Sequence, residues 1–375
     1  MEYKVRYIDY PTHFRKMERE IMETIRTVLD RGDLILRQQL CDFEDHFAAF
    51  VGTRHAVGVS NCTDGLRLAL LAAGIGARDE VITVSHTFVA TAAAIHHVGA
   101  IPVLVDIGTD HNVDVGLLED AITPRTKAIL PVHLNGRLCD MGRLMSVAER
   151  RGLIVVEDAA QALGASYDGI EAGAFGLAGC FSFYPAKLLG AFGDAGAAVT
   201  NDARIADRIR RLRDHGRTPD GDIAEWSFNC RMDNMHAAIL DLKLNFVPQW
   251  IARRREIAQL YHEGLSNVPE VRLPPPPTTE SPYFDVYQNY EIEADERDRL
   301  IDHLKEQGIE VMIPWGGKGV HQWKALGLSH YRLPQTESVF KRVLMLPLYP
   351  ELADEHVRYV VDAIRGFYVG QARIG

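Results

Sequence analysis

Cysteine is scarce in this chain, and so is any surplus of positive charge. Its five cysteines among 375 residues are scattered, with no CxxC pair and no Cys/His group at metal-ligand spacing. Neither a disulfide framework nor a zinc site of the finger type is predicted, and we expect reduced thiols in a cytoplasmic protein. The 51 acidic residues outnumber the 41 lysines and arginines, for a net charge of −10. Because nucleic-acid-binding proteins present a basic face, this balance argues against that class.

Long apolar runs are also missing. Histidine, aspartate or glycine interrupts each apolar stretch well before the roughly 18 residues that suggest a membrane span. The opening residues, MEYKVRYIDYPTHF, lack the apolar region of a secretory signal peptide. We therefore expect neither a membrane span nor a signal. With 47% hydrophobic and 25% charged residues, the rest is an ordinary soluble globular composition.

Short apolar segments alternate with helical segments through the first half of the chain. HAVGVS (55–60) and LIVVEDAA (153–160) are typical of buried strands, whereas NCTDGLRLALLAAG (61–74) and DMGRLMSVAERRG (140–152) have helical periodicity. This alternation predicts an α/β fold with a mostly parallel central sheet. In such sheets ligands bind beyond the carboxyl ends of the strands, so the polar residues there are the candidates for function.

The second half predicts a smaller domain. A polyproline linker, LPPPPTTESP (273–282), leads into an expected strand, a helix, a second strand at IEVMIP (309–314), a loop and a final helix. We predict a large domain over residues 1–250, with an N-terminal helical arm, and a small α+β domain over residues 251–375.

One lysine stands apart in the stretch CFSFYPAKLLGAFGDAGAAVT (180–200). Lys187 is the only lysine between Lys127 and Lys243, and its neighbours are small or aromatic. Burial lowers the pKa of an amine, and a neutral amine can form a Schiff base with an aldehyde. A lysine at the end of a strand can also keep its charge in solvent. The residues alone leave both possibilities open.

Groups that suit pyridoxal 5′-phosphate (PLP) follow several of the predicted strands. Asp158 ends a buried strand in VVEDAAQALGAS (155–166), where a carboxylate needs a cation such as a protonated pyridine nitrogen. Taken alone, a carboxylate at this position is more often a helix N-cap or a metal ligand. The NCTDGL turn and Ser182 offer hydroxyl and backbone N–H groups to a phosphate, and Phe88 offers a stacking face. Together with Lys187 these residues match what PLP requires.

Six segments resemble the sugar aminotransferases of the DegT/StrS branch of PLP fold type I. In order along the chain they are FEDHFAAFVGTRHAVGVSNCTDGLRLAL, DEVITVSHTFVATAAAIHHVGAIPVLVDI, PVHLNG, EDAAQALGASYDG, FSFYPAKLLGAFGDAGAAVTND and FNCRMDNMHAAIL. The resemblance covers nearly the whole chain. It implies an aspartate-aminotransferase-like fold and PLP as cofactor.

The resemblance assigns roles around the cofactor ring. Lys187 matches the lysine that binds the cofactor covalently and then moves the proton, so it is the expected catalytic residue. Asp158 matches the carboxylate on the pyridine nitrogen, Gln161 the residue near the ring hydroxyl, and Phe88 the aromatic ring stacked over the cofactor.

It also assigns a phosphate site that is shared between subunits. Thr63, Ser182 and the backbone around Cys62 and Asp64 match phosphate ligands. Asn229 matches an asparagine that reaches the same phosphate from across a dimer interface, so a homodimer with shared active sites is expected.

Substrate contacts are expected at four positions. Arg231, in the RM motif, matches a residue with a structural or a substrate-phosphate role. The loop PWGGKGVHQWKALG (314–327) replaces a family loop that faces the sugar, and it is either a substrate contact or a solvated glycine-rich loop. The expected substrate residues are Asn135, Arg231, Lys318 and His321.

The chain departs from the family pattern at several of these places. Cys62 stands where the phosphate turn usually has glycine, Asn135 where an aromatic residue is common, and Leu188 where an asparagine usually follows the lysine. These departures concern the sugar and the carbon that is aminated, and they do not touch the cofactor chemistry.

The resemblance implies transfer of an amino group from L-glutamate to a keto-6-deoxy sugar linked to dTDP, in deoxyaminosugar or antibiotic biosynthesis. Amination at C4 is favoured, with a C3 keto sugar or a cyclitol as alternatives. A sugar dehydratase on the same fold would replace the lysine by histidine. A non-catalytic PLP-binding regulatory protein would have lost Lys187 or Asp158, and the chain keeps both.

Overall fold

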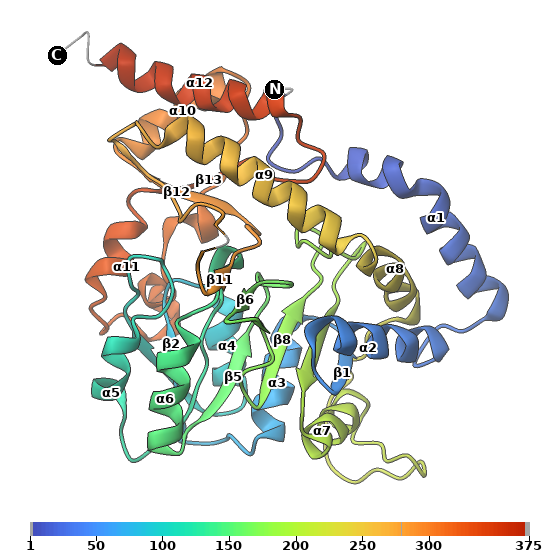
Figure 1. Cartoon of the computed structure of the whole chain (residues 1–375). Helices are drawn as coiled ribbons and strands as arrows, with labels where there is room; N and C mark the ends of the chain where they lie inside the picture. Colours follow the sequence, from blue (N-terminus) through green and yellow to red (C-terminus); the bar gives the residue numbers. More distant parts are fainter. Residues whose placement is uncertain (1–2, 279, 372–375) are drawn as a thin grey trace.

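The chain folds around a seven-stranded sheet with a smaller sheet beside it (Figure 1). The computed structural model describes residues 3–278 and 280–371. The first part of the chain contains α1 (Tyr10–Arg31), α2 (Gln38–Val51), β1 (His55–Val59), α3 (Cys62–Ala72), β2 (Glu80–Val84), α4 (Val89–His97), β3 (Ile101–Val105), η1 (Val115–Leu117), α5 (Leu118–Ala121), β4 (Thr126–Ile129), η2 (Leu134–Gly136), α6 (Met141–Arg151), β5 (Ile154–Asp158), β6 (Ser166–Tyr167), β7 (Ile170–Glu171), β8 (Ala178–Ser182), β9 (Gly196–Thr200), α7 (Ala203–Arg213) and α8 (Asn234–Leu244).

The predicted α/β fold with a mostly parallel sheet is confirmed. The strand order is β1-β9-β8-β5-β4-β2-β3, and β9 alone runs antiparallel to its neighbours. The strands are buried on both faces. In β5, Val155 faces one hydrophobic cluster with α2 and α6, and Val156 faces another with α3, α4 and α7. This alternation follows from the two-residue period of a strand.

The second part of the chain builds a three-stranded antiparallel sheet of order β10-β12-β13, which packs on three helices. Figure 1 shows α9 and α12 side by side above this sheet. The elements are α9 (Val247–Leu265), β10 (Val271–Arg272), β11 (Tyr283–Phe284), β12 (Tyr290–Ala294), α10 (Arg297–Glu306), η3 (Pro314–Gly317), η4 (Val320–Gln322), η5 (Lys324–Leu326), α11 (Pro334–Val339), β13 (Val343–Leu346) and α12 (Asp354–Gln371).

The strand predicted at residues 309–314 is wrong. Ile309 and Met312 make only isolated bridges, to Val5 and Met345. The strand that completes the small sheet is instead β13, whose four residues are all buried. An apolar run does not reveal whether a partner strand runs alongside it, and here β12 pairs with 343–346 and not with 309–314.

The domain boundary predicted after residue 250 stays a prediction. Helix α9 crosses it without a break, and Pro248 lies in the first turn of that helix, where proline is tolerated. Val5 from the N-terminal arm is buried in the hydrophobic cluster of the small sheet. The large and small parts of the chain are thus joined twice, once through α9 and once through the N-terminal arm.

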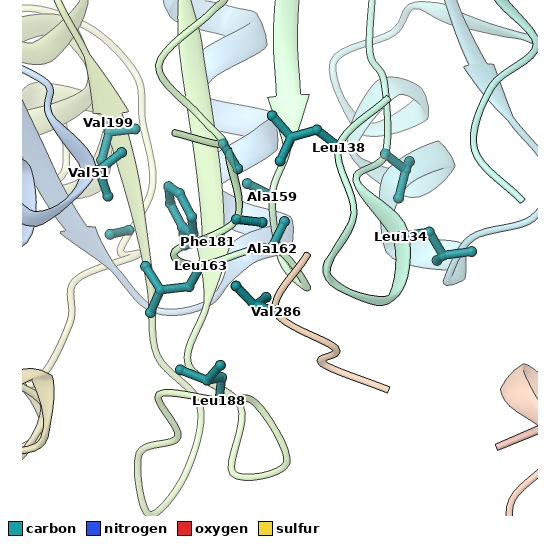
Figure 2. Packing of buried hydrophobic residues seen from close by; sticks show 14 of the residues in the cluster. Val51, Leu134, Leu138, Ala159, Ala162, Leu163, Phe181, Leu188, Val199 and Val286 are labelled. Carbon is teal, nitrogen blue, oxygen red and sulfur yellow. The ribbon is translucent and has the colours of Figure 1, made fainter. Parts of the chain in front are cut away.

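The core is continuous with the segment that carries Lys187. Phe181, Ala159 and Ala162 are buried between β5 and β8, and Leu188 belongs to the same cluster (Figure 2). Val286, from the second half of the chain, joins them. Leu188 stands where the family usually has asparagine. Because its side chain is buried in this cluster, it anchors the backbone directly after Lys187. Among the described residues no helix is long and apolar enough to cross a membrane.

Gly136 permits a close approach between the two parts of the chain. Its φ is +92°, and a Cβ there would lie 2.7 Å from the backbone nitrogen of Tyr287. The N–H of Val286 donates to the Gly136 carbonyl at 2.9 Å. Any side chain at position 136 would therefore push residues 286–288 away.

We predict that Gly136→Ala destabilises the protein more than Gly152→Ala. Gly152 also has a positive φ, +64°, but a Cβ there meets nothing within 4 Å. The control variant, Gly152→Ala, should lower the free energy of unfolding by about 1 kcal/mol, because alanine is disfavoured in the left-handed backbone region. Gly136→Ala should lose about 1–3 kcal/mol more through overpacking. Denaturant titrations measure both, and equal losses would show that residues 286–288 are not tightly docked.

Candidate active site

Asp158 is a buried carboxylate that forms no ion pair among the described residues. It ends β5, and its Oδ2 accepts a hydrogen bond from the Thr91 hydroxyl at 2.8 Å, while Oδ1 accepts from the Ala160 N–H at 3.2 Å. The Cys62 thiol lies 4.0 Å from Oδ1. Burial raises the pKa of Asp158, and no ion pair in the described ranges includes it. A cationic group on a ligand would therefore be strongly favoured beside this carboxylate.

The neighbouring Glu157 has a different role. Its carboxylate accepts hydrogen bonds from the N–H groups of Gly173, Phe175 and Gly176 at 2.7–2.9 Å, and from His133 at 2.9 Å. Both carboxylate oxygens of Glu157 accept hydrogen bonds from within the protein, so Glu157 fixes the turn before β8. Successive residues of a strand point to opposite faces, which separates the structural carboxylate from the one available to a ligand.

Lys187 lies within electrostatic range of Asp158. It follows β8 in a compact loop, where its N–H donates to the Tyr184 carbonyl at 2.8 Å. Burial lowers the pKa of the Lys187 amine, and the charges of Asp158 and Cys62 oppose that shift. A lowered pKa increases the neutral fraction of the amine, which is the nucleophilic form. The sequence predicted both the residue and this environment.

Gln288 holds the backbone on both sides of Lys187, and the sequence analysis missed it. Its side-chain oxygen accepts from the Leu188 N–H at 2.8 Å, and its Nε2 donates to the Ala186 carbonyl at 3.0 Å. Arg254, also buried, donates to the carbonyl of Gln288 itself at 3.1 Å. No motif marks Gln288, since it lies 101 residues beyond Lys187 and only the tertiary fold joins them.

Gln161 and Asn135 are also brought together. The N–H of Asn135 donates to the Gln161 side-chain oxygen at 2.8 Å. The Asn289 amide bridges the two, at 2.9 Å to the Asn135 oxygen and 3.3 Å to the Gln161 oxygen. The amide group of Gln161 is thus oriented by residues from both parts of the chain. Asn289 is a second residue that the sequence analysis missed.

The predicted phosphate turn forms the start of α3. Asn61 caps this helix by accepting from the Asp64 N–H at 2.8 Å. The Asp64 carboxylate is itself engaged by Ser60 and by Arg67. Helix geometry leaves the first N–H groups, at Cys62 and Thr63, without intrahelical partners, and the helix dipole favours an anion there.

Gly196 and Ser182 border the same turn. Ser182 is paired with Gly196 between β8 and β9. A Cβ on Gly196 would lie 2.5 Å from the carbonyl carbon of Asn61 and 2.6 Å from the Cys62 nitrogen, so the turn packs directly on this glycine. Ser182 therefore lies next to the helix start, as the sequence predicted. Phe88, just before α4, has an exposed side chain.

Four other predicted residues lie in different settings. Asn229 is exposed, and Arg231 makes an ion pair with Asp214 at 2.9 Å, which favours a structural role. Lys318 is exposed and lies 5.0 Å from the centre of the Trp323 ring. His321 is buried and hydrogen-bonded to Ser85 at 2.7 Å, with Glu337 at 3.4 Å from its other ring nitrogen. Because both of its nitrogens are engaged, the geometry favours packing over substrate contact at His321. The roles of these four residues stay predictions.

The residues at the end of the sheet fit PLP. Asp158 offers a buried carboxylate to a pyridinium nitrogen, and the start of α3 offers N–H groups to a phosphate. Lys187 supplies an amine whose pKa is lowered. The close contact of Gly196 with the turn leaves no space for a side chain at that position.

Comparisons with known proteins agree with this site. Residues 15–365 match the DegT/DnrJ/EryC1/StrS aminotransferase family. A dTDP-3-amino-3,4,6-trideoxy-alpha-D-glucose transaminase from Streptomyces venezuelae is 40% identical over 96% of both chains. A pleiotropic regulatory protein from Geobacillus stearothermophilus is 39% identical over 96% of this chain and 98% of its own.

Solved structures give the same result. DesV from S. venezuelae superimposes with a TM-score of 0.93 at 39% identity, covering 98% of this chain and 99% of its own. NtdA from Bacillus subtilis, solved with bound cofactor PMP, has a TM-score of 0.85 at 28% identity, covering 95% and 83%. The fold is therefore that of the PLP-dependent aminotransferases, and the chain belongs to the DegT/DnrJ/EryC1/StrS aminotransferase family.

Proposed function

We propose that this enzyme transfers an amino group from L-glutamate to a keto-6-deoxy sugar linked to a nucleotide, with dTDP as the expected nucleotide. The cofactor is pyridoxal 5′-phosphate. The observation that carries the proposal is the pairing of a buried Asp158 with a Lys187 of lowered pKa, in a chain whose relatives include nucleotide-sugar transaminases.

Each residue at the site contributes a defined step. When bound, PLP supplies an electron sink that lets an amino group pass between an amino acid and a keto group. Asp158 keeps a positive charge on the ring nitrogen, because a buried carboxylate gains most from a cation. Lys187 accepts and returns the proton at the carbon that carries nitrogen. The N–H groups of Cys62 and Thr63, with Ser182, hold the phosphate end.

The names of the relatives favour C3 as the carbon that is aminated, rather than the C4 that the sequence analysis preferred. The Streptomyces venezuelae relative is named for a 3-amino sugar. A relative from Acidithiobacillus ferrooxidans, 39% identical over 96% of both chains, is named as a 3-aminotransferase of a UDP sugar. We therefore propose a 3-keto sugar nucleotide as substrate.

A regulatory function is the alternative from another class, and the name of the Geobacillus relative supports it. It predicts a protein that binds PLP without turning over a sugar. The chain retains the lysine and the carboxylate that turnover requires, which favours the enzyme.

Lys187→Ala should abolish turnover while leaving PLP bound without a covalent bond. The assay incubates wild-type and variant with PLP, glutamate and a panel of 3-keto and 4-keto nucleotide sugars, and reads the amine position by NMR. Wild-type activity on a 3-keto sugar alone is expected. Amination at C4 would refute the C3 proposal, and no product from any sugar, or an active variant, would refute the enzyme proposed here.

Gln288→Leu should reduce kcat while leaving KM for the keto sugar nearly unchanged. The variant leaves the Leu188 N–H and the Ala186 carbonyl unpaired, so the Lys187 backbone can shift. A misplacement of about 1 Å can cost up to about 100-fold in rate. Gln259→Leu, on the exposed face of α9, is the matched control and should behave as wild-type. Equal loss in both variants, or a change confined to the melting temperature, would contradict a positioning role.

We also propose a homodimer in which each subunit completes the other's phosphate site. Large apolar side chains are exposed in the segments that carry predicted site residues: Tyr184 and Phe192 on either side of Lys187, and Ile223 and Trp226 before Asn229. Exposed apolar side chains that form one continuous patch are typical of an interface. A second copy of the chain would cover them and bring Asn229 to the neighbouring helix start.

Mixing two inactive variants tests this assembly. Lys187→Ala removes the amine of its own site, and Asn229→Ala should weaken the phosphate site of the partner. A mixed dimer then contains one intact site, so mixing and refolding the two should restore activity above either variant alone. No restoration, or a fully active monomer by sedimentation, would contradict the shared site.

A further inference from the structure

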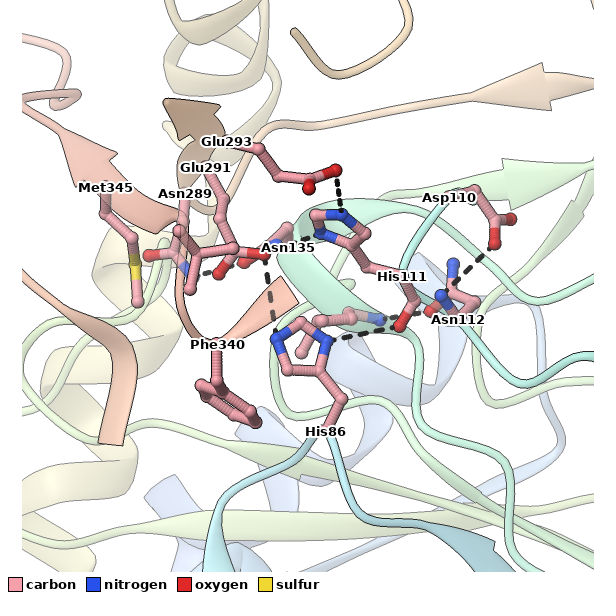
Figure 3. Close-up of polar contacts among 12 residues, drawn as sticks. His86, Asp110, His111, Asn112, Asn135, Asn289, Glu291, Glu293, Phe340 and Met345 are labelled. Carbon is pink, nitrogen blue, oxygen red and sulfur yellow. Dashed lines mark hydrogen bonds and ion pairs between the residues drawn. The ribbon is translucent and has the colours of Figure 1, made fainter. Parts of the chain in front are cut away.

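A second polar cluster lies beside the candidate active site, at the junction of the large and small sheets. His86 follows β2, His111 lies in the loop after β3, and Glu291 and Glu293 belong to β12 (Figure 3). One ligand atom from each of His86, His111 and Glu291 lies within 4.8 Å of the others. His86 and Glu291 are buried, and none of the four is used by the proposed transamination.

Two buried atoms in this cluster have no hydrogen-bond partner among the described residues. They are Nε2 of His86 and Oε2 of Glu291. The nearest Glu291 oxygen, Oε1, is 3.8 Å from His86 Nε2, which is too long for a hydrogen bond. Buried polar atoms in folded proteins are almost always paired, so two unpaired atoms in one buried cluster indicate a bound species there.

The ring of His86 has its lone pair directed toward Glu291. Its Nδ1 is 3.4 Å from the His111 carbonyl oxygen, which can only accept, so Nδ1 carries the proton. With the proton on Nδ1, Nε2 is the nitrogen that is free to bind a ligand, and the backbone carbonyl holds the ring in orientation, which is the usual arrangement of a metal-binding histidine.

His111 has the corresponding support on its other side. Its Nδ1 is 2.8 Å from Glu291 Oε1, and its Nε2 is 3.3 Å from Glu293 Oε1. Glu293 is also paired with Arg272 at 3.1 Å, which holds its carboxylate outside the cluster. A carboxylate behind a histidine that faces a shared ligand point is the second half of a carboxylate–histidine–metal arrangement.

We propose that His86 Nε2, His111 Nδ1 and Glu291 bind a divalent transition-metal ion of the zinc class, with water as the fourth ligand. Two histidines and one glutamate form a donor set that Zn²⁺ accepts. A tetrahedral ion with bonds of about 2.05 Å sets its ligands about 3.3 Å apart. The observed separations, 2.8 Å for Glu291 to His111 and 3.8 Å for Glu291 to His86, lie on either side of that value.

A cleft would give the ion a path from solvent, and the bound ion would stabilise the junction between the two parts of the chain. A cleft lined by Asn135, Arg137, Asp285 and Glu293 opens onto His111 and Glu291. The site would connect the loops after β2 and β3 to β12, two residues beyond Asn289, which orients Gln161. Metal binding would therefore stabilise the junction on which the geometry of the active site depends.

The test uses the holoenzyme after dialysis against a chelator. Addition of Zn²⁺ or Co²⁺ should give one ion per chain by elemental analysis, a higher melting temperature, and, for Co²⁺, visible ligand-field absorption that Zn²⁺ removes. Absence of a stoichiometric ion in the wild-type protein would overturn the proposal, and would show that water fills the space between His86 and Glu291.

Three variants locate the site. Glu291→Gln should lose the ion, and Glu293→Gln should weaken binding roughly 10- to 100-fold, as loss of an outer partner does. His46→Gln removes a histidine paired with Asp241 on the surface and should bind as wild-type. Circular dichroism confirms folding, and a folded Glu291→Gln protein that keeps the ion would refute the ligand set.

Discussion

The structure is organised around one buried carboxylate that has no ion pair among the described residues. Asp158 lies at the end of β5 with a threonine, a backbone N–H and a thiol around it, and burial raises its pKa although Lys187 opposes that shift. Thr91 in α4, Cys62 in α3 and Lys187 after β8 all converge on this group. A ligand that brings a positive ring nitrogen would relieve the cost of burial, so the residues proposed to bind the cofactor would also prepare it for chemistry.

The segment 285–293 connects this site to the small domain. Gly136 lets it approach the large sheet, Gln288 fixes the backbone beside Lys187, and Asn289 orients Gln161. Glu291 and Glu293, in β12, then meet His111 of the loop after β3. Successive residues of this stretch thus contact the backbone beside Lys187, the proposed cofactor residue Gln161 and the proposed metal site. A displacement of the small sheet would disturb all three together.

The sequence predicted the mostly parallel sheet from local pattern, and the family resemblance gave the aminotransferase assignment. Local pattern marked Asp158 and Lys187 as candidates and left their roles open, and the resemblance supplied those roles. The sequence-based prediction failed for the strand at 309–314, because pairing with β12 is chosen by tertiary contacts and not by the apolar run. It also placed His321 among the substrate contacts, and that role stays a prediction for a ring that the structure buries against Ser85.

The sequence alone determined the α/β fold class and the candidate residues after the strands, because they depend on periodicity and on side-chain chemistry that can be read residue by residue. The tertiary structure decided which distant groups meet. Gln288 became a neighbour of Lys187 across 101 positions, Leu188 became a core residue, and two histidines met two glutamates of another sheet. Hydrogen bonds and desolvation depend on three-dimensional proximity, and no local pattern encodes the partner of a buried polar atom.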